Sequence, residues 1–227
     1  MKEEGTQEGL VKLNVNRQPI IYGMYLTKTP TLLKKYYSKL LWEIPNQEKK
    51  IYLSFDDGPT PEVTNWVLEV LQQFNVKATF FCIGENVEKH PVIYQNILDE
   101  GHAVGNHTFN HLNGWKTNTK AYVENIKVCE KTVNSKLFRP PYGKIKKQQL
   151  KQLFLTHKIV MWDVLSGDFD QKISPQKCYE NVINNVKPGS IIVFHDSFKA
   201  AKNLKYALPK AIAFLIEKGF VFELIKH

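Results

Sequence analysis

Cysteine is scarce in this chain of 227 residues, and its three cysteines form neither a disulfide framework nor a Cys-x-x-Cys metal site. We expect Cys82, Cys129 and Cys178 to be small buried hydrophobic residues. Long apolar runs are also missing: stretches such as 191–194 are far shorter than the ~20 residues that span a bilayer. Residues 1–8 are polar and acid-rich, unlike a secretory signal. This pattern favours a protein in the cytoplasm or at the periphery of a membrane.

Negative charge is outnumbered, because 31 Lys and Arg residues face 22 Asp and Glu residues, for a formal net charge of +9. Such an excess suits contact with an acidic polymer or surface, but it is equally typical of a solvated exterior. No lysine run alternates with aromatic residues as in single-strand binders, so we expect no specific nucleic-acid partner. The length and the 43% apolar content fit one well-buried domain. The oligomeric state stays open.

We predict two regions along the chain, a short one at 1–45 and a domain at 46–227. The first begins as a polar tail, and residues 26–42 then place apolar residues at helical spacing among lysines, as in an amphipathic helix. That helix suits the end of a domain, and association with a membrane surface is the alternative.

From residue 46 on, strand-like and helix-like patterns alternate. Strand patterns lie at 50–55, 78–83, 102–106, 136–139, 158–163, 191–195 and 220–225, and helical patterns near 62–74, 86–99, 118–134, 145–155, 175–186 and 203–218. Seven strands with crossover helices predict parallel pairing, in an α/β barrel or an open doubly wound sheet. Chemistry in such folds gathers at the carboxyl ends of the strands. Polar residues stand at the predicted ends: Asp56, Asp57, His107, Arg139, Asp163 and His195.

Two of these places together form a candidate metal site. Asp56 and Asp57 leave the first strand side by side, and adjacent carboxylates repel each other unless a cation lies nearby. His107 and His111 are spaced i, i+4, so one helical turn would present both imidazoles to one ion. Alone, these patterns also suit an Asx turn and two ordinary histidines. Together Asp57, His107 and His111 are a ligand set that suits Zn²⁺ and leaves a coordination position open.

Three further motifs carry polar groups near strand ends. The prolines of segment 139–143 (Arg-Pro-Pro-Tyr-Gly) stiffen it, so it can hold Arg139 against a carboxylate and offer a backbone N–H to an oxyanion. A rigid turn with a surface arginine is the alternative. Segment 162–169 carries two aspartates, and in segment 193–196 a histidine ends a strand with an acid available, as a general acid would.

In this order, the five blocks resemble the motifs of the polysaccharide deacetylase family, also called the NodB homology domain or carbohydrate esterase family 4. The resemblance covers roughly residues 50–225. It implies a distorted (β/α)₇-type barrel as a single domain. It also implies hydrolysis of an acetamide or acetate ester on a sugar with a divalent metal, usually zinc.

The resemblance further assigns acid–base roles to individual residues. Asp56 would be the general base, paired with Arg139. His195 would be the general acid, with Asp168 orienting it and raising its pKa.

The remaining roles concern the metal and the substrate. Asp57 would join the two histidines on the metal, and the backbone N–H of Tyr142, beside Pro141, would donate to the oxyanion. Phe169 and Val193 depart from the family's usual Trp and Leu at positions that line the acetyl-methyl pocket. We therefore expect the pocket to differ in width.

The expected function is metal-dependent removal of N-acetyl groups from an N-acetylglucosamine-containing polysaccharide, such as peptidoglycan or a chitin-like polymer. Water activated by the metal would be the nucleophile, with no covalent intermediate. Two alternatives stay open: an O-acetyl esterase on acetylated xylan or another glycan, and a non-catalytic glycan-binding relative. The presence of Asp56, Arg139 and His195 argues against the second alternative, because a binding protein needs no general acid.

Overall fold

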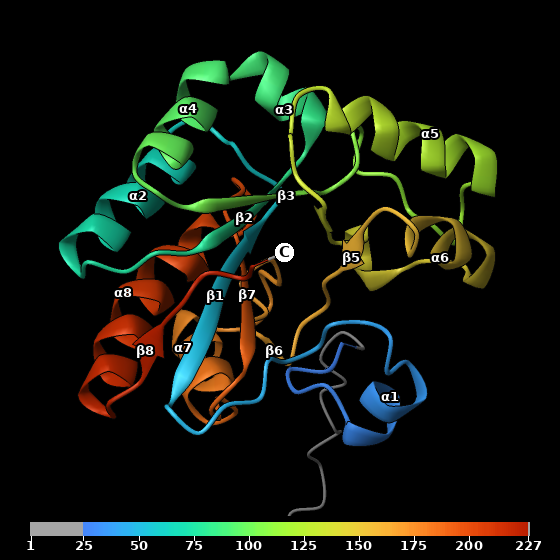
Figure 1. The fold of residues 1–227 in the computed structure, drawn as a ribbon. Coiled ribbons are helices and arrows are strands. Elements are labelled where there is room, and N and C mark those ends of the chain that lie inside the picture. Colours follow the sequence, from blue (N-terminus) through green and yellow to red (C-terminus); the bar gives the residue numbers. More distant parts are fainter. Residues whose placement is uncertain (1–24, 227) are drawn as a thin grey trace, which may run out of the picture.

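A parallel sheet organises this computed structural model, which describes residues 25–226. Within those residues its main path runs β5-β4-β3-β2-β1-β7-β6, and β8 pairs with β1 beside that path. The strands are β1 (Lys50–Asp56), β2 (Thr79–Cys82), β3 (Ala103–Asn106), β4 (Leu137–Phe138), β5 (Lys158–Ile159), β6 (Val164–Leu165), β7 (Ile191–His195) and β8 (Val221–Phe222). The sheet curls with helices outside it (Figure 1). The predicted (β/α)₇-type barrel is confirmed.

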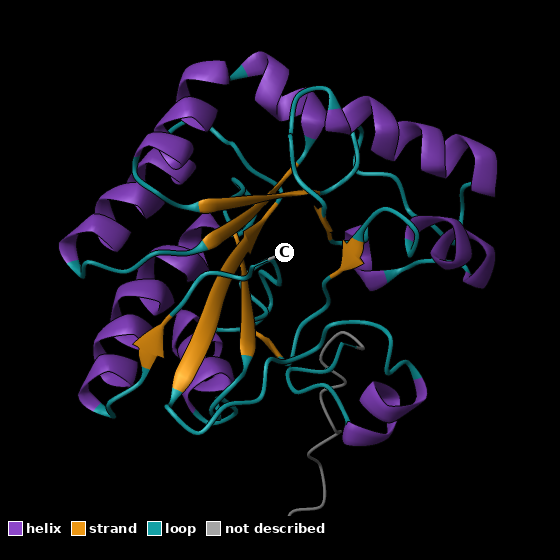
Figure 2. Ribbon diagram, in the orientation of Figure 1, coloured by secondary structure: helices purple, strands orange, loops and turns teal. Residues whose placement is uncertain are grey.

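Helices cover the outer side of the curled sheet, with α2, α4 and α8 on one flank and α5 and α6 on the other (Figures 1 and 2). The helices are α1 (Thr31–Tyr36), α2 (Val63–Gln73), α3 (Gly84–Lys89), α4 (Pro91–Asp99), α5 (Thr119–Glu130), α6 (Lys147–Leu153), α7 (Pro175–Ile183) and α8 (Ala201–Glu217). A short 3₁₀ turn, η1 (Pro141–Gly143), follows β4. Two helices begin at side-chain caps: Asn118 accepts from the Ala121 N–H, and Ser174 accepts from the Lys177 N–H.

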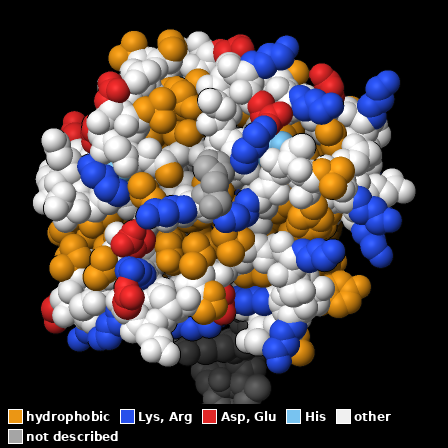
Figure 3. Space-filling model, in the orientation of Figure 1, with side chains coloured by type: hydrophobic (Ala, Val, Ile, Leu, Met, Phe, Trp, Pro, Cys, Tyr) orange, Lys and Arg blue, Asp and Glu red, His pale blue; other side chains and the backbone are white. Residues whose placement is uncertain are grey.

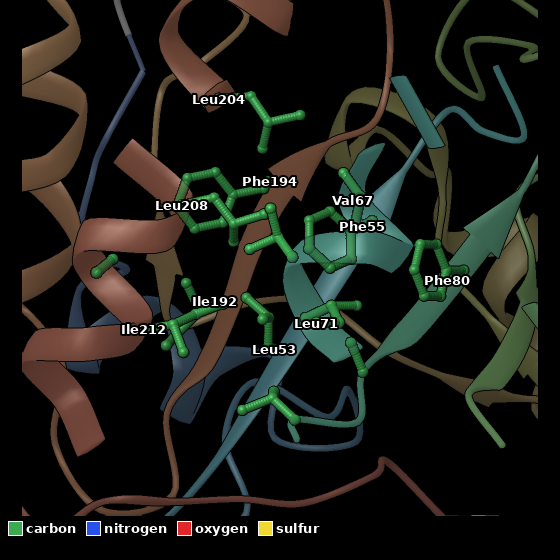
Figure 4. Close-up of a cluster of buried hydrophobic side chains, with 14 of the residues drawn as sticks. Leu53, Phe55, Val67, Leu71, Phe80, Ile192, Phe194, Leu204, Leu208 and Ile212 are labelled. Carbon is green, nitrogen blue, oxygen red and sulfur yellow. The ribbon is translucent and has the colours of Figure 1, made fainter. Parts of the chain in front are cut away.

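The main hydrophobic core lies between the sheet and its helices. From Ile51 onward every residue of β1 is buried, as expected for a parallel strand covered on both faces. In Figure 4, side chains of β1 and β7 around Phe55 meet two leucines and one isoleucine from α8, and Phe80 and α2 lie on the other side. This packing holds the carboxyl ends of β1 and β7 in register, with Asp56 opposite His195.

Two predicted helices were wrong in extent. The segment 86–99 is two helices, because Pro91 begins α4 and cannot continue the hydrogen bonding of α3. The segment 26–42 is helical only over α1, which buries none of its own residues. Without an apolar face packed on a partner, a longer helix gains little from the tertiary structure.

The predicted strand 158–163 was also wrong. Within that segment only β5 (Lys158–Ile159) is a strand, and the next strand, β6 (Val164–Leu165), begins after the segment and lies at the opposite edge of the sheet. The predicted strand 220–225 is confined to β8, which lies off the main path. β6 therefore completes the seven-strand path.

The part of the N-terminal region that the structure describes packs between the two open edges of the sheet. Leu41 forms a bridge to Val160 beside β5, and Lys28 forms an antiparallel bridge to Val164 in β6. The Trp42 side chain is buried in a second core cluster. Residues 25–44 thus join edges that the strands alone leave apart. The domain boundary at residue 46 stays a prediction, and the predicted polar tail at 1–24 lies outside the described residues.

The surface is basic without a single dominant patch on the face shown in Figure 3, where blue Lys and Arg side chains are interspersed with hydrophobic groups. Cys82, Cys129 and Cys178 are buried and free, as predicted. None of the described helices combines the length and the apolar character that crossing a bilayer requires.

Candidate active site

Three side chains that the sequence predicts as metal ligands converge beyond the ends of β1 and β3. The His111 Nε2 atom lies 3.2 Å from Asp57 Oδ1, and the His107 Nε2 atom lies 3.7 Å from the same oxygen. One ligand atom from each residue fits within 4.8 Å of the others. This spacing allows all three to bind one ion.

The backbone that carries His107 and His111 differs from the prediction, because the two histidines lie on a loop and not on a helical turn. Thr108 and His111 both have positive φ, 64° and 56°. Asn106 stabilises the loop by accepting from the Thr108 N–H, and the Thr108 hydroxyl accepts from the Leu112 N–H. These bonds compensate for backbone conformations that non-glycine residues seldom adopt.

The protonation states of these ligands fit a divalent cation. His107 Nδ1 lies 2.8 Å from the Arg139 carbonyl oxygen. A carbonyl only accepts, so Nδ1 carries the proton and Nε2 is left with a lone pair. Burial, the main cause, lowers the pKa of His107 to about 4, so the ring is neutral at pH 7. Burial alone would raise the pKa of Asp57, but its hydrogen bond with His111 and the surrounding histidines hold it below its usual range.

The Asp56 carboxylate lies beside the metal ligands and is held by a buried arginine. Arg139 Nη1 donates to Asp56 Oδ1 at 2.6 Å and to Ser54 Oγ at 2.9 Å. Nη2 donates to the Met161 carbonyl, and the guanidinium lies 4.0 Å from the Phe81 ring centre. The arginine is fully buried, so this network fixes which oxygen of Asp56 stays available on the cavity side.

His195 ends β7, where it pairs in register with Asp56 at the end of β1, and Asp168 holds it in two ways. Its Nδ1 lies 2.8 Å from Asp168 Oδ1, and its backbone N–H donates to Oδ2 at 2.7 Å. Burial disfavours the imidazolium, but the Asp168 carboxylate outweighs that effect, and the pKa of His195 rises to about 9. The ring is therefore charged at neutral pH, the opposite state to His107.

One cavity of about 600 Å³ joins these groups. Its lining includes eight residues predicted from the sequence: Asp56, Asp57, His107, His111, Tyr142, Phe169, Val193 and His195. Arg139 and Asp168 lie behind the cavity wall, where they contact Asp56 and His195. Pro141 is buried beside Tyr142 in the chain. The Tyr142 ring centre lies 4.6 Å from the His111 ring centre. Tyr142 has a positive φ of 61°.

Asp163 does not belong to the site, contrary to the prediction. It lies between β5 and β6, at the opposite end of the sheet, where its carboxylate pairs with Lys28 and Lys34 and accepts from the Ser190 hydroxyl. The prediction failed because the strand assigned to 158–163 does not end there.

Sequence reasoning assigned no role to several residues that contribute to the site. Asp196 accepts from the Gly58 N–H at 3.0 Å and from the Thr64 hydroxyl at 2.6 Å, which anchors the turn after Asp57. Its position beside His195 was the only signal. Asn86 donates to the Asp57 carbonyl at 2.8 Å, and no local pattern marks it.

The cavity lining also includes residues outside the predicted set of site residues. They are Tyr25, Lys144, Trp162, Leu165, Ser197 and Lys199. Most come from loops whose approach to the cavity depends on how the chain folds, so sequence spacing could not place them.

Known proteins are similar to this chain in sequence and in fold. A sequence model described as polysaccharide deacetylase matches residues 43–156. A peptidoglycan-N-acetylglucosamine deacetylase of Bacillus cereus is 42% identical over 67% of this chain, which spans 58% of that relative. A second protein of that name from the same organism is 35% identical over 80% of this chain and 88% of its own length.

Among solved structures, the Bc1960 peptidoglycan N-acetylglucosamine deacetylase, in complex with 4-naphthalen-1-yl-N-oxidanyl-benzamide, superposes with a TM-score of 0.76. It is 35% identical, and the match covers 84% of this chain and 94% of that one. These matches, together with the parallel barrel described above, identify the family of this chain. It belongs to the polysaccharide deacetylase family.

Proposed function

We propose that this protein is a metal-dependent hydrolase that removes N-acetyl groups from an N-acetylglucosamine-containing polysaccharide, with peptidoglycan as the first candidate. One observation carries the proposal. Asp56 and the His195 imidazolium line one cavity together with an Asp-His-His ligand set. An acid and a base in these states are what hydrolysis of an amide needs. The names of the relatives support the acetamido sugar as the substrate class.

Asp57, His107 and His111 would hold the metal, and Zn²⁺ suits their nitrogen and oxygen donors. When bound, a divalent ion there polarises the acetyl carbonyl and acidifies a water molecule. The neutral imidazole of His107 and the anionic carboxylate of Asp57 are already in the states that binding requires, so no proton has to leave them at pH 7.

Asp56 would take the proton from the attacking water. Its Oδ1 atom accepts from Arg139, which leaves Oδ2 for that proton. Arg139 acts as a positioning residue, since it touches Asp56 and does not line the cavity. Tyr142 stands on the rim beside His111, and we assign its backbone N–H to the developing oxyanion.

His195 would protonate the departing sugar nitrogen. An amide releases its amine poorly unless the nitrogen gains a proton, so the general acid must begin as imidazolium. The raised pKa of His195 supplies that state up to about pH 9. Removing a general acid or base typically costs about 10²–10⁴-fold in rate.

The test is acetate release from three substrates: chitooligosaccharides, peptidoglycan fragments and acetylated xylan. We expect release from the amide substrates, its loss with a chelator, and its loss in Asp57→Ala. His90→Ala is the matched control, because His90 joins α3 to α4 and does not line the cavity. Release from xylan alone would identify an esterase. Glycan binding without release from any substrate would identify a non-catalytic relative.

A further inference from the structure

One wall of the cavity comes from the N-terminal region, before the residues that match the family. Tyr25 lines the cavity with Phe169 and Lys199. The Tyr25 ring centre lies 5.1 Å from that of Phe169, which in turn meets the His195 ring edge to face at 5.0 Å. We call Tyr25 and Phe169 the aromatic wall. It lies on the side of the cavity where the general acid stands.

The backbone after Tyr25 is anchored to the barrel. The Leu165 N–H donates to the Thr27 carbonyl, and the Thr29 N–H donates to the Asp163 carbonyl, both at 2.9 Å. The Lys28 ammonium lies 2.5 Å from the buried Asp163 carboxylate. These bonds extend the sheet by a short antiparallel segment along β6, so the approach of Tyr25 to the cavity is determined by paired backbone.

The Tyr25 side chain is held from two further directions. Its hydroxyl donates to Asp170 Oδ2 at 3.1 Å. The ring covers Gly167, where an added Cβ would lie 2.7 Å from the Tyr25 hydroxyl oxygen. Gly167 has a φ of 75°, so the backbone there also favours glycine. A ring that is fixed at its tip and along one edge loses little conformational entropy when a ligand packs against it.

We propose that Tyr25 is a substrate-contacting, specificity-determining residue, whose ring packs against the pyranose that carries the acetamido group. The inference rests on the proposed function above. His195 gives its proton to the sugar nitrogen, so the sugar must lie beside the aromatic wall that contacts His195. An aromatic side chain with a tethered polar tip suits a sugar, which has apolar C–H faces and a polar edge.

Steady-state kinetics of metal-loaded Tyr25→Ala, Tyr25→Phe and Tyr36→Ala on N-acetylated oligosaccharides test this proposal. Tyr36 is the matched control, because it is an aromatic residue of the same region that is 80% exposed and does not line the cavity. We expect Tyr25→Ala to raise KM about threefold to tenfold with kcat changed less than twofold. Tyr25→Phe keeps the ring and should keep most of the affinity. Tyr36→Ala should match the unmodified protein.

Calorimetric binding of tri-N-acetylchitotriose to metal-free protein gives a second readout that needs no turnover, and thermal unfolding reports whether the variants fold. An unchanged KM and an unchanged dissociation constant in Tyr25→Ala would overturn the proposal while leaving the proposed function intact. The proposal would also be overturned if the two variants, Tyr25→Ala and Tyr25→Phe, showed the same loss of kcat and the same loss of melting temperature. That result would mean a purely structural role for Tyr25. If the unmodified protein neither binds nor deacetylates any N-acetylated glycan, the proposed function fails and this inference fails with it.

Discussion

Asp168→Asn should move the basic limb of the activity profile to lower pH. Asp168 does not line the cavity, so the substitution leaves the lining of the cavity unchanged and removes the charge that faces His195. The folded-state pKa of His195 is raised, so its acid function is present at neutral pH and is lost as the pH rises through that pKa. Without the Asp168 carboxylate, burial opposes the imidazolium more effectively, and only the charges of Asp57 and Asp56 still raise the pKa of the ring.

The size of the shift follows from the contact. A buried hydrogen bond to a charged group contributes about 1.5–3 kcal/mol, and 1.36 kcal/mol corresponds to one pKa unit. Loss of the Asp168 charge should therefore lower the pKa of His195 from about 9 to about 7–8. At pH 9 the imidazolium fraction then falls about fivefold to fiftyfold, while at pH 6.5 it changes by less than about twofold.

The assay is kcat/KM for acetate release between pH 6 and 10, which reports groups of the free enzyme. Asp170→Asn is the control, because Asp170 is two residues away and bonds Tyr25 rather than His195. Its basic limb should stay in place. If Asp168→Asn lowers the rate by the same factor at every pH, His195 is not the group whose ionisation governs the limb, and the acid assignment is wrong.

Three further predictions follow from the same site. Chelation should abolish acetate release, and one equivalent of Zn²⁺ should restore it in the unmodified protein. The same addition should not restore it in His107→Ala. Restoration in that variant would mean that the metal binds elsewhere. Arg139→Met should lower the free energy of unfolding in urea by about 3–5 kcal/mol, because it leaves the buried Asp56 carboxylate without its partner; a loss below 1 kcal/mol would contradict this. Gly58→Ala should cost about 1–3 kcal/mol and weaken metal binding, since its Cβ would lie 1.9 Å from Asp196 Oδ2; unchanged stability and metal affinity would show that the turn has room.

Sequence patterns predicted a parallel α/β fold because its central strands are buried on both faces and therefore appear as apolar runs, and the resemblance to the family implied the barrel form. β1 and β7 are of this kind, and their ends were placed to within one residue. β5 and β6 have two residues each, and their separation depends on the N-terminal region that packs between them. A pattern of local hydrophobicity carries no information about that packing.

The candidate site likewise contains residues that sequence patterns predicted and residues that they could not predict. Asp57, His107 and His111 were predicted as a set, although the helical turn proposed for the histidines is a loop with positive φ at Thr108 and His111. Tyr25 was missed because it reaches the cavity through a contact 145 residues away in sequence, with Asp170. Such contacts arise from the tertiary fold, whereas ligands that cluster at strand ends follow from the topology.

The most direct test of the central claim is a titration of Zn²⁺ into metal-free protein, with acetate release from N-acetylated oligosaccharide followed at each step. The arrangement of Asp57, His107 and His111 predicts that activity starts near zero and rises linearly to a plateau at one ion per chain. In Asp57→Ala it should stay near zero at the same Zn²⁺ concentrations. Full activity before any metal is added, or a plateau reached equally well by Asp57→Ala, would contradict the account.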